Sequence, residues 1–164
     1  MPEPDLGAFA FAQDGPMYVV TAAADGLRGG CLVGFASQCS IEPPRFVVWL
    51  SVANHTYEVA RRAHHLTVHV LREDQKALAR LFGSHTGDRT DKFARTGWRP
   101  GREGTPVLDD VAHWFTGRIE AIVAGGDHEG FLLVPVDGSP PAPGPAGPPL
   151  RYGAVHDLSP GHPA

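Results

Sequence analysis

Glycine and proline interrupt this chain so often that its apolar segments are short. The sequence of 164 residues contains 20 glycines and 16 prolines. Between them, apolar residues often alternate with polar ones, which is the period of a strand with one buried face. Short strands joined by hairpin-length turns favour an antiparallel barrel with helical crossovers over a parallel doubly wound sheet. No Gly-x-Gly-x-x-Gly motif follows a predicted strand, which disfavours a Rossmann dinucleotide fold.

Six segments have the composition of strands. Residues 17–24 are apolar and rich in β-branched and aromatic side chains, and they end at Asp25-Gly26, a hairpin turn signal. We expect Gly29-Gly30 to close that turn and residues 31–36 to return. The other predicted strands are 45–51, apolar on both faces, 66–70, the half-exposed run 115–123, and 131–136, which follows a turn at 125–128.

Two helices are predicted between these strands. Asn54 can cap the first, which we expect to run to about residue 63, because its side-chain oxygen can accept from the N2 or N3 amide. The second begins near Asp74, has apolar residues at helical spacing, and ends at Gly83. Two further predictions are one helical turn within 88–95 and an irregular loop rich in glycine and proline at 97–106.

The length fits a single domain, 1–164, with its core at about 15–137. Residues 139–149 are nearly all Pro, Gly and Ala, a composition that cannot bury much apolar area. This stretch therefore predicts a surface linker that carries a short C-terminal segment, 150–164.

Charge and hydropathy argue against several partners. The net charge of −4 and the lack of a Lys/Arg cluster argue against nucleic acid. No window approaches the roughly 18 to 20 apolar residues that span a bilayer, and the first residues lack the pattern of a secretion signal. We therefore expect a soluble cytoplasmic protein without membrane contact, in which Cys31 and Cys39 are reduced thiols rather than a disulfide.

Nine histidines raise the question of a metal site, but the sequence predicts none. On a strand, His65 and His69 would share a face about 13 Å apart, too far to ligate one ion together. No thiolate or carboxylate is spaced to complete a site near them or near His64. A serine hydrolase is also disfavoured, because Ser37 lacks the glycine frame of a nucleophile elbow.

Three segments carry more polar chemistry than their local structure requires. Residues 34–44 place small residues and hydroxyls where a strand breaks, which leaves backbone amides able to approach a flat polar ligand. Asn54 and Thr56 stand at a predicted helix N-terminus, a setting suited to a phosphate. Asp127-His128 places an imidazole at a hairpin tip beside a carboxylate that can fix its tautomer. Taken singly, each also fits an ordinary strand end, a helix cap or an idle turn histidine.

In order along the chain, these segments resemble the flavin reductase-like family of FMN-binding split barrels. Residues 37–44, Ser-Gln-Cys-Ser-Ile-Glu-Pro-Pro, are similar to that family's Ser-rich stretch ending in Asp/Glu-Pro-Pro, and residues 51–56 to its phosphate-side loop. The resemblance covers about residues 15–137. Its further matches are 66–71, Asp74-Gln75, Leu81-Phe82-Gly83, Asp91-Lys92-Phe93 and Gly126-Asp127-His128, with a weaker echo at Leu150-Arg151-Tyr152-Gly153.

The resemblance implies a mainly β Greek-key split barrel that forms a homodimer, with FMN or FAD near the subunit interface and NADH or NADPH as the hydride donor. It implies that His128 faces the flavin and the nicotinamide as the catalytic residue. It further implies that Lys92 and Phe93 close the pocket, one by charge and one by packing. The other implied cofactor-binding residues are Gly34, Phe35, Ala36, Ser37, Gln38, Cys39 and Ser40 along the flavin ring and ribityl chain, and Ser51, Asn54 and Thr56 at the phosphate.

The chain departs from the family pattern at three positions. Gly34 and Gln38 stand where many relatives carry Ser or Thr, and Pro135 stands where many carry Gly, which suggests an edge position for that strand. Separately, the apolar strand 45–51, with the surfaces of Trp49 and Trp114, exceeds what one small barrel covers and also favours a homodimer.

The leading functional interpretation is an NAD(P)H-dependent flavin oxidoreductase that can supply reduced flavin to a separate monooxygenase. The hydride chemistry would belong to the flavin itself. One alternative is a flavin-binding protein without turnover, used for storage or sensing. Another is a different split-barrel activity, either an oxidase with tightly held flavin or a haem-binding protein.

Overall fold

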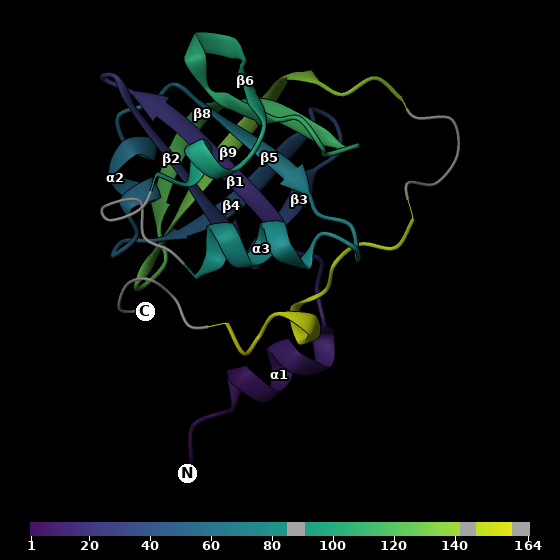
Figure 1. Cartoon of the computed structure of the whole chain (residues 1–164). Coiled ribbons are helices and arrows are strands. Elements are labelled where there is room, and N and C mark those ends of the chain that lie inside the picture. The colour runs from purple at the N-terminus through teal and green to yellow at the C-terminus, as the bar shows by residue number, and fades with distance from the viewer. Residues whose placement is uncertain (85–90, 142–146, 159–164) are drawn as a thin grey trace.

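The computed structural model describes residues 1–84, 91–141 and 147–158, and its centre is an antiparallel sheet curled into a barrel (Figure 1). The sheet has seven strands in the order β2-β1-β5-β8-β9-β4-β3, so strands distant in the sequence become neighbours. The predicted mainly β barrel with helical crossovers is confirmed. The strands are β1 (Tyr18–Ala24), β2 (Leu27–Val33), β3 (Ala36–Ser40), β4 (Arg45–Ser51), β5 (His65–Val70), β8 (Trp114–Ala124) and β9 (His128–Gly138).

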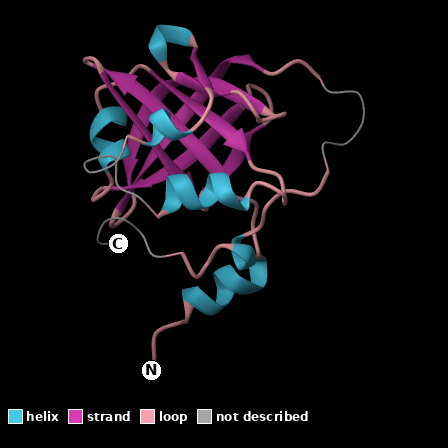
Figure 2. Ribbon diagram, viewed as in Figure 1, coloured by secondary structure: helices cyan, strands magenta, loops and turns pink. Residues whose placement is uncertain are grey.

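Short helices surround the barrel, and the N-terminal helix α1 projects from it (Figure 2). Helix α2 begins after the Asn54 cap as predicted but ends at Ala60, three residues early. The stretch 97–106, predicted as an irregular loop, instead holds β6 and η2 and reaches the first residue of β7, the strand that pairs with β6. The turn predicted within 88–95 is present as η1, although 88–90 lie outside the described residues. The remaining elements are α1 (Leu6–Gln13), α2 (His55–Ala60), α3 (Lys76–Gly83), β6 (Trp98–Pro100), β7 (Pro106–Leu108), η1 (Lys92–Arg95), η2 (Arg102–Gly104) and η3 (Tyr152–Ala154).

The first hairpin turns at Asp25-Gly26, and both residues have positive φ angles, 53° and 77°. This conformation matches the twist of the flanking strands and suits Asp-Gly. The prediction that Gly29-Gly30 closes the turn was wrong, because both glycines lie within β2. Their lack of a side chain serves packing instead, since a Cβ at Gly30 would lie 2.7 Å from the Phe82 ring.

Strand β4 is buried on one face only, so the prediction of two buried faces was wrong. Val48 and Leu50 are buried inside the barrel, whereas Val47 and Trp49 are only half-buried on the outer face. The apolar outer residues of β4 thus do not mark a central layer. Val47 and Trp49 instead contribute apolar surface to the outside of the barrel, near the end of β4.

Pro135 lies in an inner strand rather than at the predicted edge, since β9 pairs with both β8 and β4. The pairing with β4 stops at Leu133, so Pro135 is beyond the last β4 partner. On its other side, the β8 register shifts between Thr116 and Gly117, opposite Pro135. Proline has no backbone N–H to donate, and it stands where the hydrogen bonds between the strands are already interrupted.

Two apolar clusters lie on opposite faces of β1, as the period of two requires. Val20 points into the barrel lumen, where it belongs to the cluster of Leu66 and Phe131. Val19 belongs instead to an outer cluster that includes Phe82 of α3 and Leu150 of the C-terminal segment. The outer cluster therefore attaches both α3 and residues near the C-terminus to the barrel wall.

The C-terminal part of the predicted linker is paired with the barrel rather than loose. The Met17 amide donates to the Leu150 carbonyl at 2.8 Å, and the Leu150 amide donates to the Leu71 carbonyl at 2.9 Å. Isolated bridges join Pro149 to Arg72 and Arg151 to Pro16. The segment 147–158 therefore lies between β1 and the end of β5, while 142–146 lie outside the described residues.

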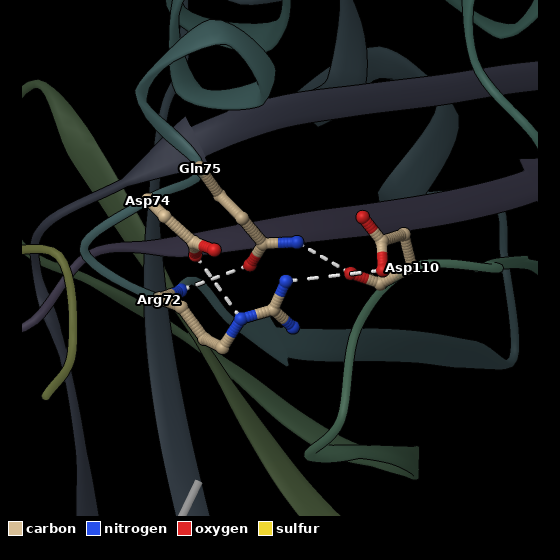
Figure 3. Close-up of polar contacts among 4 residues, drawn as sticks. All are labelled: Arg72, Asp74, Gln75 and Asp110. Carbon is tan, nitrogen blue, oxygen red and sulfur yellow. Dashed lines mark hydrogen bonds and ion pairs between the residues drawn. The ribbon is translucent and has the colours of Figure 1, made fainter. Parts of the chain in front are cut away.

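The turn that receives this segment is held by a polar network (Figure 3). Arg72 donates through Nε to Asp74 at 3.1 Å, and its backbone amide donates to the Gln75 side chain at 2.9 Å. The Gln75 amide group also donates to the Asp110 carbonyl, and the Arg72 guanidinium lies 3.8 Å from the Asp110 carboxylate. The β5–α3 turn is thereby connected to the loop after β7.

His69 is a structural residue, fully buried between the sheet and β7. Its Nδ1 lies 2.9 Å from the Val19 carbonyl, and its Nε2 accepts from the Leu108 amide at 3.1 Å. A carbonyl only accepts, so the neutral Nδ1–H tautomer satisfies both contacts. Burial lowers the pKa of His69 to about 4, because the charged form would lose hydration.

We predict that this histidine makes stability fall as the pH is lowered. The unfolded chain takes up the proton near pH 6.5 and the folded chain only near pH 4, so stability is lost between these values, by at most about 3 kcal/mol. Urea unfolding from pH 7 to pH 4.5 measures the loss. His69→Gln should be less stable at pH 7 and show a flatter pH profile. An equally steep profile in the variant would assign the effect to other groups.

Candidate functional site

A cavity of about 510 Å³ lies where β2 and β4 end and β9 begins. Its volume is within the range of clefts that hold cofactor-sized ligands, roughly 300 to 1,000 Å³. Most of its walls are apolar, and its polar side chains come from strand ends and from the C-terminal segment. The lining residues are Met17, Cys31, Leu32, Val33, Gly34, Phe35, Trp49, Leu50, Ser51, Asn54, Phe82, Gly83, His128, Tyr152, Val155, His156 and Leu158.

His128 begins β9 and lies directly opposite Ser51, the last residue of β4, in the strand pairing. Its Nδ1 lies 2.7 Å from the Asp127 carboxylate, which only accepts when ionised, so Nδ1 carries a proton. The Phe35 ring lies 5.2 Å from the imidazole, centroid to centroid. His128 is therefore oriented on two sides, and its Nε2 is left as the atom that can meet a ligand.

Trp49 fixes the turn that carries His128. A Cβ at Gly125 or Gly130 would lie 2.5 or 2.8 Å from the Trp49 ring, so only glycine lets the β8–β9 hairpin pack this closely. The Val52 amide also donates to the Asp127 carbonyl at 3.0 Å. The ends of β4 and β9 consequently form one unit beside the cavity.

The predicted phosphate-side residues divide into two groups. Asn54 and Ser51 line the cavity. The Asn54 side-chain oxygen accepts from the Thr56 amide at 2.9 Å, which is the capping contact expected from the sequence. Thr56 itself is buried behind the wall, against Gly29 and beside Cys31. Burial raises the pKa of the Cys31 thiol, and the Lys92 charge and the bond with Thr56 oppose this shift.

Of the residues expected along the flavin ring and ribityl chain, only two line the cavity. Gly34 and Phe35 line it, immediately after β2. The next five residues form β3, an edge strand with an exposed or half-exposed surface, and they do not line this cavity. Gln38 lines a second cavity of about 450 Å³ on another side of the barrel. The five residues of β3 are Ala36, Ser37, Gln38, Cys39 and Ser40.

Lys92 and Phe93 lie behind the cavity wall rather than across its mouth. Lys92 is 4% exposed, and its Nζ donates to the carbonyls of Gly30 and Phe82, each at 2.9 Å. Burial lowers the pKa of Lys92. The Phe93 ring packs edge-on against Phe82 at 5.6 Å. In this arrangement both residues support β2 and α3, which form the wall.

Sequence reasoning missed the C-terminal contribution to the site. Tyr152, Val155, His156 and Leu158 line the cavity, although this part of the chain was predicted only as a segment carried by a linker. The one available signal was the echo of the family pattern at residues 150–153. Apolar residues near a proline-rich stretch do not reveal which surface they cover.

Two of the three histidines near residues 64–69 have other partners. Both ring nitrogens of His69 have protein partners, and His64 lies 2.9 Å from the Glu103 carboxylate. In the described parts of the chain, no group of three His, Cys, Asp or Glu side chains is arranged to hold a metal ion. Within the same residues, no helix is long and apolar enough to cross a membrane.

The lining of the cavity combines flat apolar side chains with a few polar ones. Phe35 and Trp49 offer flat apolar surfaces for a ring system, while Ser51, Asn54 and His128 place polar groups beside them. Such a combination of apolar walls with a few converging polar groups is typical of cofactor sites. The barrel and this cavity define the class of flavin-binding split barrels.

Comparison with known proteins agrees with this class. A family model described as "Flavin reductase like domain" matches residues 13–157. A flavin reductase domain protein from Arthrobacter sp. FB24 has the same fold, with a TM-score of 0.78 and 23% identity over 97% of this chain and 94% of that one. The predicted Greek-key split barrel is thus confirmed, and the chain belongs to the flavin reductase-like family.

Two curated relatives are similar over most of this chain. "Probable flavin reductase" of Rhizobium meliloti (strain 1021) is 34% identical over 123 residues, 75% of this chain and 38% of that protein. The reductase component of a 4-nitrophenol 4-monooxygenase/4-nitrocatechol 2-monooxygenase of Rhodococcus opacus is 31% identical over 134 residues, 82% of this chain and 68% of that protein. The chain therefore spans well under half of the first relative's length.

We predict that Lys92→Met lowers the free energy of unfolding by about 1 to 3 kcal/mol, because the carbonyls of Gly30 and Phe82 lose their buried donor. Urea denaturation of the protein measures the change. The matched control is Lys76→Met, which alters an exposed lysine at the start of α3 and should leave stability nearly unchanged. Equal stability of the two variants would contradict the supporting role of Lys92.

Proposed function

We propose that this chain is a reductase that transfers hydride from NADH or NADPH to FMN or FAD. The observation that carries the proposal is the convergence of three distant segments on one cavity. Residues Gly34 and Phe35, residues Ser51 and Asn54, and His128 all line it, and these are the segments in which the sequence resembles the family. The three segments are far apart in the sequence, so local structure alone does not explain why they meet at one cavity.

The residues of this chain have separate roles in the proposed reaction. The flavin supplies the hydride-accepting chemistry when bound. Met17, Leu32 and Phe35 provide apolar walls that exclude water and hold flat rings in contact, which the reaction needs because reacting atoms must approach to about 3 to 3.5 Å. His128, oriented by Asp127, offers Nε2 to the bound ligands. It can orient a carboxamide or steady charge that develops beside it.

The relatives support both the reaction and a partner. One relative, from Streptomyces pristinaespiralis, is named an NADH:riboflavin 5'-phosphate oxidoreductase and is 30% identical over 123 residues. The Rhodococcus opacus relative is the reductase component of a monooxygenase. By analogy, the reduced flavin made by this chain would serve a separate flavin-dependent monooxygenase. The proposal places the enzyme in the cytoplasm, a compartment in which free thiols such as Cys39 persist.

We expect His128→Ala to lower kcat/KM for the nicotinamide nucleotide by about 10- to 100-fold, the effect of losing one orienting or charge-stabilising contact. Flavin affinity should change much less, because the apolar walls remain. Anaerobic stopped-flow reduction of FMN and FAD by NADH and NADPH, at matched flavin occupancy, measures the rates.

The control is His64→Ala, which removes an exposed histidine outside the cavity lining and should react like the wild type. Equal reduction rates in His128→Ala and wild type would remove His128 from the mechanism. A wild-type protein that binds flavin but consumes no nucleotide above background would favour the non-catalytic alternative. An absorption spectrum of haem in the purified protein would overturn the proposal altogether.

The proposed enzyme is a homodimer, and an apolar surface beside the cavity supports this. Phe35, Val52 and Val123 are exposed large apolar side chains. They lie close together, because Phe35 contacts His128, Val52 bonds to Asp127, and Val123 pairs with Gly130. Exposed apolar surfaces of this kind often mark protein interfaces. A second copy placed there would border the flavin cavity.

We predict that Val123→Asp converts the dimer into a monomer, because a charge would be desolvated in the interface. Light scattering at micromolar concentration with flavin present gives the mass of each species. Leu27→Asp is the matched control, since Leu27 is similarly exposed but lies in β2 directly after the first hairpin turn. A wild-type monomer under these conditions would rule out the homodimer.

A further inference from the structure

The C-terminal segment is built into the cavity wall by backbone contacts at several points. Besides its pairing with β1 and the end of β5, the Glu73 amide donates to the Pro148 carbonyl at 3.1 Å. The Gly153 amide donates to the Asp14 carboxylate at 2.8 Å, and the Tyr152 amide donates to the Gly15 carbonyl at 2.9 Å. The segment, yellow in Figure 1, lies beside α1 and below α3. The backbone of the segment is therefore held at a defined position against the barrel.

The Arg72 turn gives this segment a firm support. The network of Arg72, Asp74, Gln75 and Asp110 fixes the turn on which Pro149 forms its bridge (Figure 3). Leu150 is 1% exposed and anchors the segment in the outer apolar cluster. Residues that line a ligand cavity are most effective when a packed framework holds them in this way.

His156 is the side chain of this wall whose hydrogen-bonding atoms are best defined. Its Nδ1 lies 2.9 Å from the Gly153 carbonyl, which only accepts, so Nδ1 carries the proton. The ring also packs edge-on against Phe11 of α1 at 4.9 Å. In the neutral imidazole, Nε2 is then an acceptor, and the side chain lines the cavity. Its natural ligand partner is an N–H or O–H donor on a planar molecule.

We propose that the C-terminal segment forms the nucleotide side of the site, with His156 accepting a hydrogen bond from the carboxamide of the nicotinamide ring. This inference rests on the proposed reductase function. Hydride transfer requires two flat rings in contact, so one must face the barrel residues Gly34 and Phe35 and the other the remaining wall. Tyr152 and His156 supply that wall, and a carboxamide NH₂ group is the donor that Nε2 requires. His156 is accordingly a binding residue for the hydride donor and not for the flavin.

The test compares His156→Ala, His156→Gln and the control His113→Ala, which changes a histidine of the other cavity. Steady-state oxidation of NADH gives KM and kcat, flavin fluorescence titration gives the flavin Kd, and quenching of tryptophan fluorescence by NAD⁺ reports nucleotide binding without turnover. We expect His156→Ala to raise KM for NADH about ten-fold, equivalent to about 1.4 kcal/mol, with kcat and flavin Kd nearly unchanged. His156→Gln, whose side-chain oxygen can replace Nε2 as acceptor, should recover part of the loss.

The outcomes separate this inference from the proposed function. An unchanged KM in His156→Ala, or a weaker flavin Kd at constant KM, would overturn the nucleotide wall while leaving the reductase intact. If the wild type binds NAD⁺ and His156→Ala does not, yet neither turns over, the wall stands and the reductase proposal fails. Absence of both turnover and NAD⁺ binding in the wild type would overturn both. A loss in His113→Ala equal to that in His156→Ala would also contradict the assignment.

Discussion

The packing of Trp49 against the glycines of the β8–β9 hairpin is the contact on which the site depends. Because Gly125 and Gly130 have no side chain, the indole can lie directly on the hairpin backbone. This contact adds to the β4–β9 pairing that places His128 opposite Ser51. Without it, the hairpin turn would be held only by hydrogen bonds near its end. This close approach holds the turn from which Asp127 and His128 reach the cavity.

Buried polar groups hold the rest of the molecule around that centre. His69 connects β1, β5 and β7 through its two ring nitrogens, and Lys92 connects β2 with α3 through two carbonyls. Neither contact is an ion pair with a carboxylate. Each contact stabilises the fold, because a buried carbonyl or amide without a hydrogen-bond partner costs free energy in a medium of low dielectric constant. His69, considered as a metal ligand, and Lys92, expected at the cofactor, thus both support the fold.

The segment at residues 147–158, supported by residues of the N-terminal region, adds to the site that the barrel begins. The strand ends provide one side of the cavity, and the segment at residues 147–158 provides another, braced by Asp14 and by Phe11 of α1. The cavity therefore combines residues 152–158 with residues of the strand ends that lie far from them in the sequence. Such a construction allows a barrel shared by many proteins to acquire its own ligand preferences by changes in a short peripheral segment.

The sequence by itself determined six of the strands, the helix cap at Asn54 and the order of the three segments that resemble the family, because these depend on local periodicity and turn chemistry. It did not reveal β3, β6 or β7, which are short and lie in stretches rich in small residues or in glycine and proline. The resemblance to the family also located His128, Gly34 and Ser51 at one cavity. The tertiary structure alone decided that Gly29 and Gly30 serve packing, that Lys92 supports the wall, and that His156 joins the lining. These outcomes depend on contacts between residues far apart in the chain, such as Gly30 with Phe82, and no local pattern records which side chain a neighbouring strand or segment will bring.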